Sequence, residues 1–254
     1  MKLFDLSGRV AIVTGGNGGI GLGMARGMAA AGAAVVVAGR DAAKNAAAVK
    51  ELQALGGKAS AIAVDVLKEE SCRGLIADTV KQHGRLDILV NNAGINIRKQ
   101  PQEFTLAEWH QVMDSNLTSA FLCSHAAYPE MMKAGAGKMI NIGSMMSIFG
   151  ASFTTAYAAS KGGIVQMTKA MATAWAKDNI QVNAILPGWI DTALTQRART
   201  DVPALHDSVL KRTPAGRWGT PDDFAGIAVF LASPASDYVT GAAITVDGGY
   251  SVQG

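Results

Sequence analysis

Charge and cysteine are both scarce in this chain of 254 residues. Charged side chains make up 17% of the sequence, and 23 Lys and Arg residues against 20 Asp and Glu residues leave a formal net charge of +3. This near balance argues against binding to nucleic acid or to a membrane surface. The only two cysteines, Cys72 and Cys123, provide neither a disulfide framework nor a CxxC motif. We therefore expect a cytoplasmic protein.

Long apolar runs are also missing. The N-terminus reaches Asp5 before an apolar segment develops, which argues against a secretory signal. The longest apolar candidate, residues 27–39, is shorter than the roughly 20 residues that span a membrane. The four histidines are scattered and lack the spacing of metal ligands: His83, His110, His125 and His206. The sequence thus predicts neither a membrane segment nor a metal site.

Glycine, in contrast, is abundant. The chain has 29 glycines, nine of which lie in the first 32 residues, and 49% of all residues are hydrophobic. Average glycine usage is only about 7%. The hydrophobic content excludes intrinsic disorder and is large enough for a substantial core. The crowding of glycine near the N-terminus therefore needs a local explanation.

Short β-branched runs alternate with helical patterns along the whole chain. This alternation is typical of right-handed βαβ units around a parallel sheet. Most runs are apolar without alternation, as expected for strands that are covered on both faces. We predict an α/β, single-domain Rossmann fold over residues 1–254, with helices on both faces of a doubly wound, parallel, seven-stranded sheet. The predicted strands are residues 10–14, 34–38, 59–64, 86–91, 138–142, 181–186 and 243–246.

Several helix boundaries can be read from capping residues. Asp41 is a predicted N-cap for an alanine-rich helix. Thr105 and Glu108 form a capping box for a helix over residues 106–133. Asn116 falls inside this second helix although asparagine has a poor helix propensity. A local kink or a bound water would explain its position.

The first predicted strand runs directly into the turn Thr14-Gly15-Gly16-Asn17-Gly18-Gly19-Ile20-Gly21. A helical pattern follows, so the turn opens a βαβ unit. Glycines in such a turn permit positive φ and let backbone N–H groups approach a pyrophosphate at the helix N-terminus. A tight turn that merely packs the helix on the strand is the simpler alternative.

Further motifs follow in an order that resembles the short-chain dehydrogenase/reductase family. The turn matches the family's pattern TGxxxGxG. It is followed, at compatible spacings, by Asp65-Val66, Asn91-Asn92-Ala93-Gly94, Asn116, Ser144, Tyr157-x-x-x-Lys161 and Pro187-Gly188. The resemblance covers essentially the whole chain. It implies an oxidoreductase that transfers a hydride between NAD(P)(H) and a secondary alcohol or ketone.

Tyr157 and Lys161 are four residues apart, so on a helix they share one face. A nearby ammonium favours the phenolate of a tyrosine, whose ordinary pKa is about 10. By themselves the two could be a surface tyrosine and a solvated lysine, and Ser144 could be a turn residue. The resemblance implies a catalytic tetrad. In it, Tyr157 is the general acid/base and the Ser144 hydroxyl orients the carbonyl. The Lys161 ammonium binds the ribose, and the Asn116 amide holds a water.

The end of the second strand bears on the choice of cofactor. An acid there would bind both ribose hydroxyls and repel a 2′-phosphate, whereas an arginine pairs with that phosphate. This chain has Gly39 where NAD-dependent members of the family carry the acid, and Arg40 follows. We therefore favour NADP, with NAD as the alternative. The predicted cofactor-binding residues are Gly15, Asn17, Gly19, Ile20, Gly21, Arg40, Asp65, Val66, Asn91, Ala93, Gly94, Tyr157, Lys161, Pro187, Gly188, Ile190 and Thr192.

The substrate signals are fewer. Met146 and Trp189 lie just after predicted site motifs and suggest an apolar wall, although both could be core residues. Arg98 could bind a carboxylate bidentately or be a solvated surface residue. These three are the candidate substrate residues. The irregular segment 189–213 is expected to be a loop that serves as a substrate lid.

Segments 96–100, 214–219 and 235–241 resemble the gluconate and deoxygluconate dehydrogenases of the family. The resemblance implies a polyol or sugar-acid substrate and a homotetramer. A 3-oxoacyl thioester reductase is the alternative enzyme. A non-catalytic nucleotide-binding scaffold is the alternative of another class, because fold alone does not determine function.

Overall fold

The computed structural model describes residues 2–254 and contains one sheet of seven parallel strands in the order β3-β2-β1-β4-β5-β6-β7. This is the predicted doubly wound α/β fold. Every predicted strand is confirmed, with ends within two residues of the prediction. The strands are β1 (Val10–Thr14), β2 (Ala34–Gly39), β3 (Lys58–Ala63), β4 (Ile88–Asn91), β5 (Gly137–Ile142), β6 (Ile180–Pro187) and β7 (Ala243–Val246).

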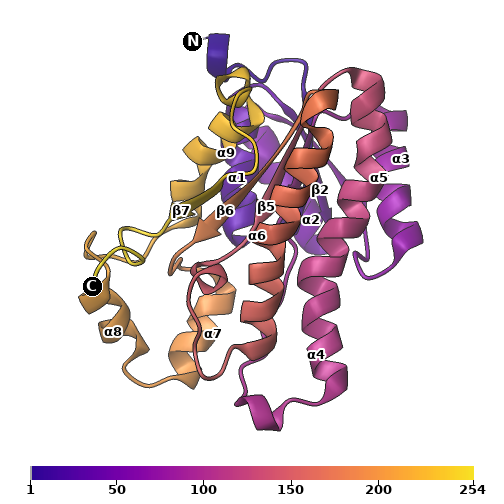
Figure 1. Cartoon of the computed structure of the whole chain (residues 1–254). Coiled ribbons are helices and arrows are strands. Elements are labelled where there is room, and N and C mark those ends of the chain that lie inside the picture. The colour runs from indigo at the N-terminus through magenta and orange to yellow at the C-terminus, as the bar shows by residue number, and fades with distance from the viewer. Residues whose placement is uncertain (1) are drawn as a thin grey trace.

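Helices cover both faces of the sheet (Figure 1). One face carries α1 (Gly19–Ala30), α2 (Ala42–Ala54) and α9 (Ala225–Ala232). The other face carries α3 (Glu69–His83), α5 (Ser119–Ala134) and α6 (Thr155–Trp175). Within residues 2–254, no helix combines the length and apolar character needed to cross a bilayer.

Strand β1 shows why the apolar runs do not alternate with polar residues. Ala11 and Val13 pack in the core beneath α1, α2 and α9. Val10 and Ile12 point to the opposite core beneath α3, α5 and α6. Successive side chains of a strand face opposite sides, so a strand buried on both sides needs apolar residues at every position.

The capping residues begin helices where the sequence places them. The Asp41 carboxylate accepts the backbone N–H of Lys44 at 3.0 Å and so caps α2. Thr105 and Glu108 form the capping box of α4 (Leu106–Met113). Helices α4 and α5 are joined by the π-helical turn Asp114–Thr118, which contains Asn116. This turn is the local irregularity expected within residues 106–133.

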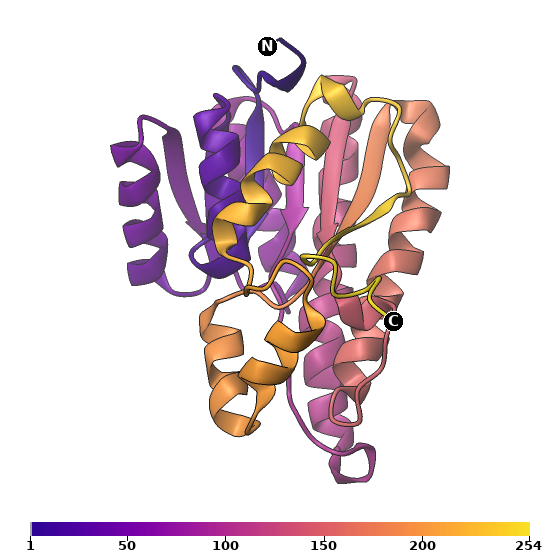
Figure 2. The same cartoon turned by 90° about the vertical axis from the view of Figure 1, so that its left-hand side faces the viewer.

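The expectation of a loop over residues 189–213 is wrong, because this segment contains α7 (Ala193–Asp201) and α8 (Leu205–Arg212). Figures 1 and 2 show both helices beyond the carboxyl ends of the strands. Aromatic residues distant in sequence hold them. The guanidinium carbon of Arg199 lies 4.2 Å from the Trp218 ring centroid, and that of Arg212 lies 4.4 Å from the Tyr250 ring centroid. Such contacts leave no local sequence pattern.

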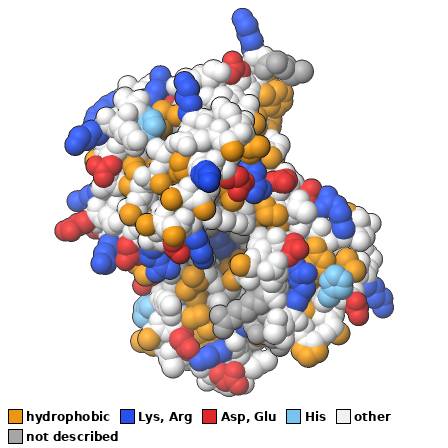
Figure 3. Space-filling view, turned by 180° about the vertical axis from the view of Figure 1, so that it is seen from behind, with side chains coloured by type: hydrophobic (Ala, Val, Ile, Leu, Met, Phe, Trp, Pro, Cys, Tyr) orange, Lys and Arg blue, Asp and Glu red, His pale blue; other side chains and the backbone are white. Residues whose placement is uncertain are grey.

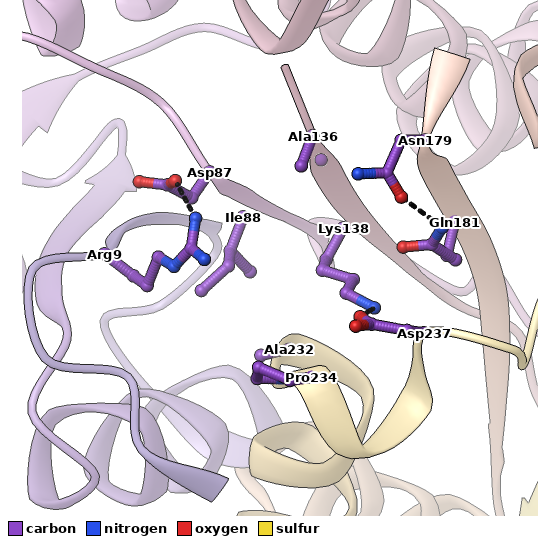
Figure 4. Close-up of a pocket in the computed structure, with 11 residues that line it drawn as sticks. Arg9, Asp87, Ile88, Ala136, Lys138, Asn179, Gln181, Ala232, Pro234 and Asp237 are labelled. Atoms are coloured by element: carbon purple, nitrogen blue, oxygen red, sulfur yellow. Dashed lines mark hydrogen bonds and ion pairs between the residues drawn. The ribbon is translucent and has the colours of Figure 1, made fainter. Parts of the chain in front are cut away.

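A cavity of about 120 Å³ lies at the opposite edge of the sheet, where β4, β5 and β6 begin. In Figure 4, Lys138 points toward Asp237 and Arg9 points toward Asp87. The Lys138 Nζ lies 2.7 Å from Asp237 Oδ1, and Arg9 Nη1 lies 2.8 Å from Asp87 Oδ1. These ion pairs join elements far apart in sequence, and we interpret the cluster as structural.

Candidate active site

The glycine-rich turn leaves the N-terminus of α1 open. Gly15 and Gly19 have φ angles of +64° and +52°, in the left-handed region that favours glycine. A Cβ at Gly21 would lie 2.5 Å from the Gly15 carbonyl oxygen, so only glycine fits there. Gly18 precedes the helix, and no side chain in the described part of the chain caps it. A bound diphosphate can satisfy the first N–H groups of such a helix.

Thr14 and Asn92 hold this turn against the end of β4. The Thr14 hydroxyl accepts the backbone N–H groups of Asn92 and Ala93 at 3.0 and 3.1 Å. The Asn92 side-chain amide donates to the carbonyl oxygens of Thr14 and Gly15 at 3.0 and 3.1 Å. Each of these groups has a partner, so the backbone of the turn is already ordered for a ligand.

A cavity of about 260 Å³ lies where β2 ends, and the predicted residues Arg40, Asp65 and Val66 line it together with Asp41 and Lys44. Its two carboxylates are engaged locally. Asp41 caps α2, and Asp65 accepts a backbone N–H within its own turn at 3.2 Å. Arg40 and Lys44 provide cationic groups in the same wall, which suits an anionic ligand such as a phosphate.

A larger cavity of about 610 Å³ lies at the carboxyl ends of the strands, where open α/β sheets bind ligands. Figure 3 shows a hollow between the larger and the smaller part of the molecule, with Lys and Arg side chains at its margin. Five residues, two of them in the turn, line both cavities, so the two adjoin: Gly15, Asn17, Lys44, Ala93 and Gly94. The predicted residues that line the larger one are Gly15, Asn17, Gly19, Ile20, Ala93, Gly94, Ser144, Tyr157, Lys161, Pro187, Gly188, Ile190 and Thr192.

Lys161 is buried in the wall of the larger cavity, with 4% of its surface exposed. Its Nζ donates to the carbonyl oxygen of Ile142 at 2.7 Å and lies 5.7 Å from the centroid of the Tyr157 ring. Burial disfavours the ammonium and lowers the pKa of Lys161 to about 8. The side chain can therefore change its charge close to neutral pH.

Tyr157 and Ser144 face the same cavity. Burial raises the pKa of the Tyr157 phenol, while the Ser144 hydroxyl and the Arg98 guanidinium act in the opposite direction. A phenol of raised pKa keeps its proton at neutral pH and can donate it to an oxygen that gains negative charge. The Ser144 Oγ accepts the Met146 N–H at 3.1 Å, which orients the hydroxyl.

Asn116 connects the π-helical turn to two other parts of the site. Its Oδ1 accepts the Ile95 N–H at 2.8 Å, and its Nδ2 donates to the Ile95 carbonyl oxygen at 3.0 Å. The same amide donates to Ser160 Oγ at 3.0 Å, on the helix that carries Tyr157. A Cβ at Gly94 would lie 2.9 Å from Asn116 Oδ1, so glycine is needed beside it.

The remaining predicted residues lie outside the walls of these two cavities. Asn91 is buried in β4 and donates to Ser124 Oγ and Asn141 Oδ1 at 2.9 and 2.8 Å. These bonds tie β4 to α5 and β5 beneath the cavity. Trp189 lines a separate cavity of about 200 Å³. The other three are Gly21, which packs against the turn, Met146, whose N–H donates to Ser144 Oγ, and Arg98, whose charge acts on the Tyr157 phenol.

Sequence reasoning missed five residues that line the larger cavity: Lys44, Ile142, Ala193, Leu194 and Thr195. Three others, Gly18, Asn92 and Gly143, belong to or adjoin the site motifs but have no predicted role in the cavity wall. Asn92 belongs to the recognised NNAG motif, and its neighbours could have pointed to it. Lys44 is the third residue after the predicted N-cap Asp41, so its place near the helix start was also open to prediction. Residues 193–195 lie in the irregular segment and belong to no site motif.

The comparisons with known proteins agree with this geometry. A family model described as enoyl-(acyl carrier protein) reductase matches residues 15–251, which include all residues that line the two cavities. The chain belongs to the short-chain dehydrogenase/reductase family. It is an NAD(P)-dependent oxidoreductase that acts on the CH–OH group of secondary alcohols and on the corresponding ketones. The scaffold alternative is thereby set aside.

Curated relatives and solved structures match nearly the whole chain. It is 44% identical over 250 residues to a 2-dehydro-3-deoxy-D-gluconate 5-dehydrogenase of Formosa agariphila, covering 98% of this chain and 95% of the relative. It is 40% identical over 250 residues to a gluconate 5-dehydrogenase of Gluconobacter oxydans, covering 98% and 97%. The crystal structure of a gluconate 5-dehydrogenase from Burkholderia cenocepacia in complex with NADP and tartrate is 41% identical, covers 100% and 99%, and has a TM-score of 0.94.

Proposed function

We propose that this enzyme oxidises one hydroxyl of a sugar acid, or reduces the matching keto acid, and that it prefers NADP(H) to NAD(H). The observation that carries the substrate assignment is the charge of Arg98, which reaches the Tyr157 phenol and opposes the rise in its pKa that burial causes. A carboxylate bound by Arg98 would hold the hydroxyl of the same molecule near Tyr157. The names of the relatives and the tartrate in the Burkholderia structure support a hydroxy-acid substrate.

The residues of the larger cavity have separate tasks in this reaction. The nicotinamide cofactor, when bound, supplies or takes up the hydride. Tyr157 gives its proton to the carbonyl oxygen in reduction and takes a proton from the hydroxyl in oxidation. Ser144 donates to the same oxygen and stabilises the charge that develops on it. Lys161 would hold the nicotinamide ribose and, when protonated, favour the phenolate. Asn116 would hold a water through which the lysine exchanges protons with solvent.

The preference for NADP rests on the smaller cavity. Arg40 and Lys44 both line it, and its carboxylates accept backbone N–H groups of their own segments. A 2′-phosphate carries negative charge that a guanidinium binds in planar, bidentate fashion. The NADP in the Burkholderia structure supports the same choice.

Two further features of the family complete the proposal. Helix α9 has no charged residue, and Gly226, Val229 and Phe230 are not fully buried, which supports a subunit interface there and hence the homotetramer. The two buried free cysteines fit the reducing cytoplasm. Sedimentation analysis of the purified protein tests the assembly, since a monomer at micromolar concentration would contradict it.

We also propose that α7 and α8 form a substrate lid. Residues 193–195 line the larger cavity at the start of α7, and Leu194 remains 42% exposed although it is apolar. Closure over a bound substrate would cover this leucine and exclude water from the reacting atoms. Protection of residues 193–212 from hydrogen exchange should then increase when cofactor and substrate are added together.

A substrate panel tests the proposed reaction. The purified enzyme is assayed with keto acids of six-carbon sugars, neutral keto sugars and 3-oxoacyl thioesters, each with NADPH and with NADH. We expect the highest kcat/KM for a sugar keto acid with NADPH. Faster reduction of a 3-oxoacyl thioester would instead support a 3-oxoacyl thioester reductase. Equal rates on acidic and neutral keto sugars would show that Arg98 does not bind a substrate carboxylate.

A further inference from the structure

Two side-chain amides join the glycine-rich turn to the end of β2. The Nδ2 of Asn17, in the turn, donates to the Oδ1 of Asn45, in α2, at 2.6 Å. The Nδ2 of Asn45 donates in turn to the carbonyl oxygen of Gly39 at 2.8 Å. Asn45 is only 3% exposed, whereas Asn17 is half-buried at the cavity wall, so the two bonds are partly shielded from water. The turn and the strand end are therefore held at a fixed separation.

This pair of amides fills the space beside Gly39. A Cβ at position 39 would lie 2.6 Å from Asn17 Nδ2 and 2.9 Å from Asn45 Oδ1. Gly39 is not among the glycines with positive φ, so its backbone conformation does not require glycine. The two amides occupy the space that a larger side chain would need, so such a side chain fits only if they move. They lie at the strand end where dinucleotide-binding proteins place an acid for the 2′-hydroxyl.

We propose that Asn45 is a positioning residue for cofactor choice, which keeps Asn17 in the place that an acidic side chain at position 39 would occupy. The inference rests on the proposed preference for NADP. With the acid excluded and Asp41 engaged as the cap of α2, the cations Arg40 and Lys44 dominate the adenosine end of the site. Specificity then comes from attraction of the phosphate by these cations, at a strand end whose packing leaves no room for an acid at position 39.

A double-mutant design separates this proposal from a general loss of stability. The variants are Gly39→Asp, Asn45→Ala and both together, and the dissociation constants for NAD and NADP are measured by fluorescence titration. In the single Gly39→Asp variant the amides keep the carboxylate out of place, so NAD affinity should improve by less than about threefold. Removal of Asn45 frees Asn17 to rotate. The double variant should then bind NAD about tenfold more tightly than Gly39→Asp, the value of one charge-assisted hydrogen bond.

A control on the same helix tests whether any lost bond has this effect. Gln53 also donates from α2 to a backbone carbonyl, that of Ala59, at 3.0 Å and away from the turn. The Gln53→Ala substitution, added to Gly39→Asp, should leave both dissociation constants unchanged. The proposal is overturned if this combination improves NAD affinity as much as Asn45→Ala does, or if Gly39→Asp alone binds NAD as tightly as the double variant.

If Gly39→Asp prevents folding, variants with a smaller side chain at position 39 can still test the role of Asn45. Gly39→Ala adds only the Cβ, which should lower Tm and weaken NADP binding. Adding Asn45→Ala should recover at least half of both losses, whereas additive losses would contradict the proposal. The wild-type titration tests the cofactor preference separately. A wild-type protein that prefers NAD would refute the proposed NADP preference, while the comparison of single and double variants would still decide the role of Asn45.

Discussion

The ammonium nitrogen of Lys161 lies 2.7 Å from the carbonyl oxygen of Ile142, which ties α6 to the last residue of β5. The lysine is almost completely buried, and this burial lowers its pKa to about 8. A backbone carbonyl carries no formal charge, so it can orient the ammonium without neutralising it. The charge of Lys161 thus remains available to Tyr157, the proposed general acid/base.

The lowered pKa of Lys161 predicts how stability varies with pH. The folded-state pKa is about 8 and the ordinary value is 10.5. Between these values the unfolded chain binds more protons than the folded one, so the stability of the wild-type enzyme should rise with pH by roughly 3 kcal/mol. Lys161→Met should lack this rise. Urea denaturation from pH 7.5 to 10 measures it, and the exposed-site variant Lys169→Met should behave as wild type. Parallel curves for wild type and Lys161→Met would contradict the assignment.

Removing one oxygen from Tyr157 should stop the reaction and spare the cofactor site. We expect Tyr157→Phe to lower kcat by about a thousandfold, the contribution of a positioned general acid/base. Dinucleotide affinity, measured by fluorescence titration, should stay within about threefold, because the turn and Arg40 are unchanged. Tyr128→Phe is the matched control, since this hydroxyl bonds only to Asp178 at 2.9 Å among the partners described. Comparable losses in both variants would exclude the catalytic role.

The fold was largely predictable because its main determinants are local or repetitive. Strands such as β1 are buried on both faces and are therefore apolar at every position. Helix α2 begins at an N-cap that can be read directly from Asp41. Helix α7 was not predicted. Its Arg199 contacts Trp218, which follows the helix by many residues. A pattern search along the chain cannot find such a contact.

The site shows the same division. Tyr157 and Lys161 share a helix face and Gly15 belongs to a turn motif, so spacing alone brings them to notice. The hydrogen bond between Asn17 and Asn45 joins residues 28 positions apart and has no motif. Its importance appears only when the space beside Gly39 is measured. Sequence patterns thus predict the candidate reacting groups, whereas the contact of Asn17 with Asn45 can be read only from the folded structure.

Asp87 should stabilise the fold from the edge opposite the active site. Its nearly buried carboxylate accepts from Arg9, Arg85 and the Val10 N–H, and the hydrogen bonds together hold its pKa below the ordinary value despite burial. Asp87→Asn should lower the free energy of unfolding at pH 7 by about 2 kcal/mol. Because the pKa is lowered, this stabilisation is present above pH 3.8 and is lost as the pH falls through the folded value. Urea midpoints at pH 7 and pH 3 measure it, with the exposed Asp78→Asn as control. An equal effect at both pH values would contradict the prediction.

The guanidinium of Arg40 should contribute to NADP binding far more than to NAD binding. Replacing Arg40 by Ala removes a cation from the smaller cavity and should raise KM for NADP by about tenfold or more. KM for NAD should change by less than about twofold, because NAD has no phosphate at this position. Steady-state assays with both cofactors and one substrate measure the difference. If both KM values rise alike, the residue supports the cavity wall and does not read the phosphate.

Arg98 should distinguish acidic from neutral substrates. The charge of the Arg98 guanidinium reaches the Tyr157 phenol. One substrate molecule can therefore place its carboxylate at Arg98 and its reacting hydroxyl at Tyr157. Arg98→Met should raise KM for a sugar acid by about 10 to 100 times, the value of a charge-assisted pair, and leave KM for a neutral polyol nearly unchanged. Arg98→Lys should restore only part of the loss, because an ammonium cannot form the planar bidentate pair. A full rescue by lysine would show that charge alone matters, whereas equal losses on acidic and neutral substrates would show that Arg98 acts through Tyr157 and not through the carboxylate.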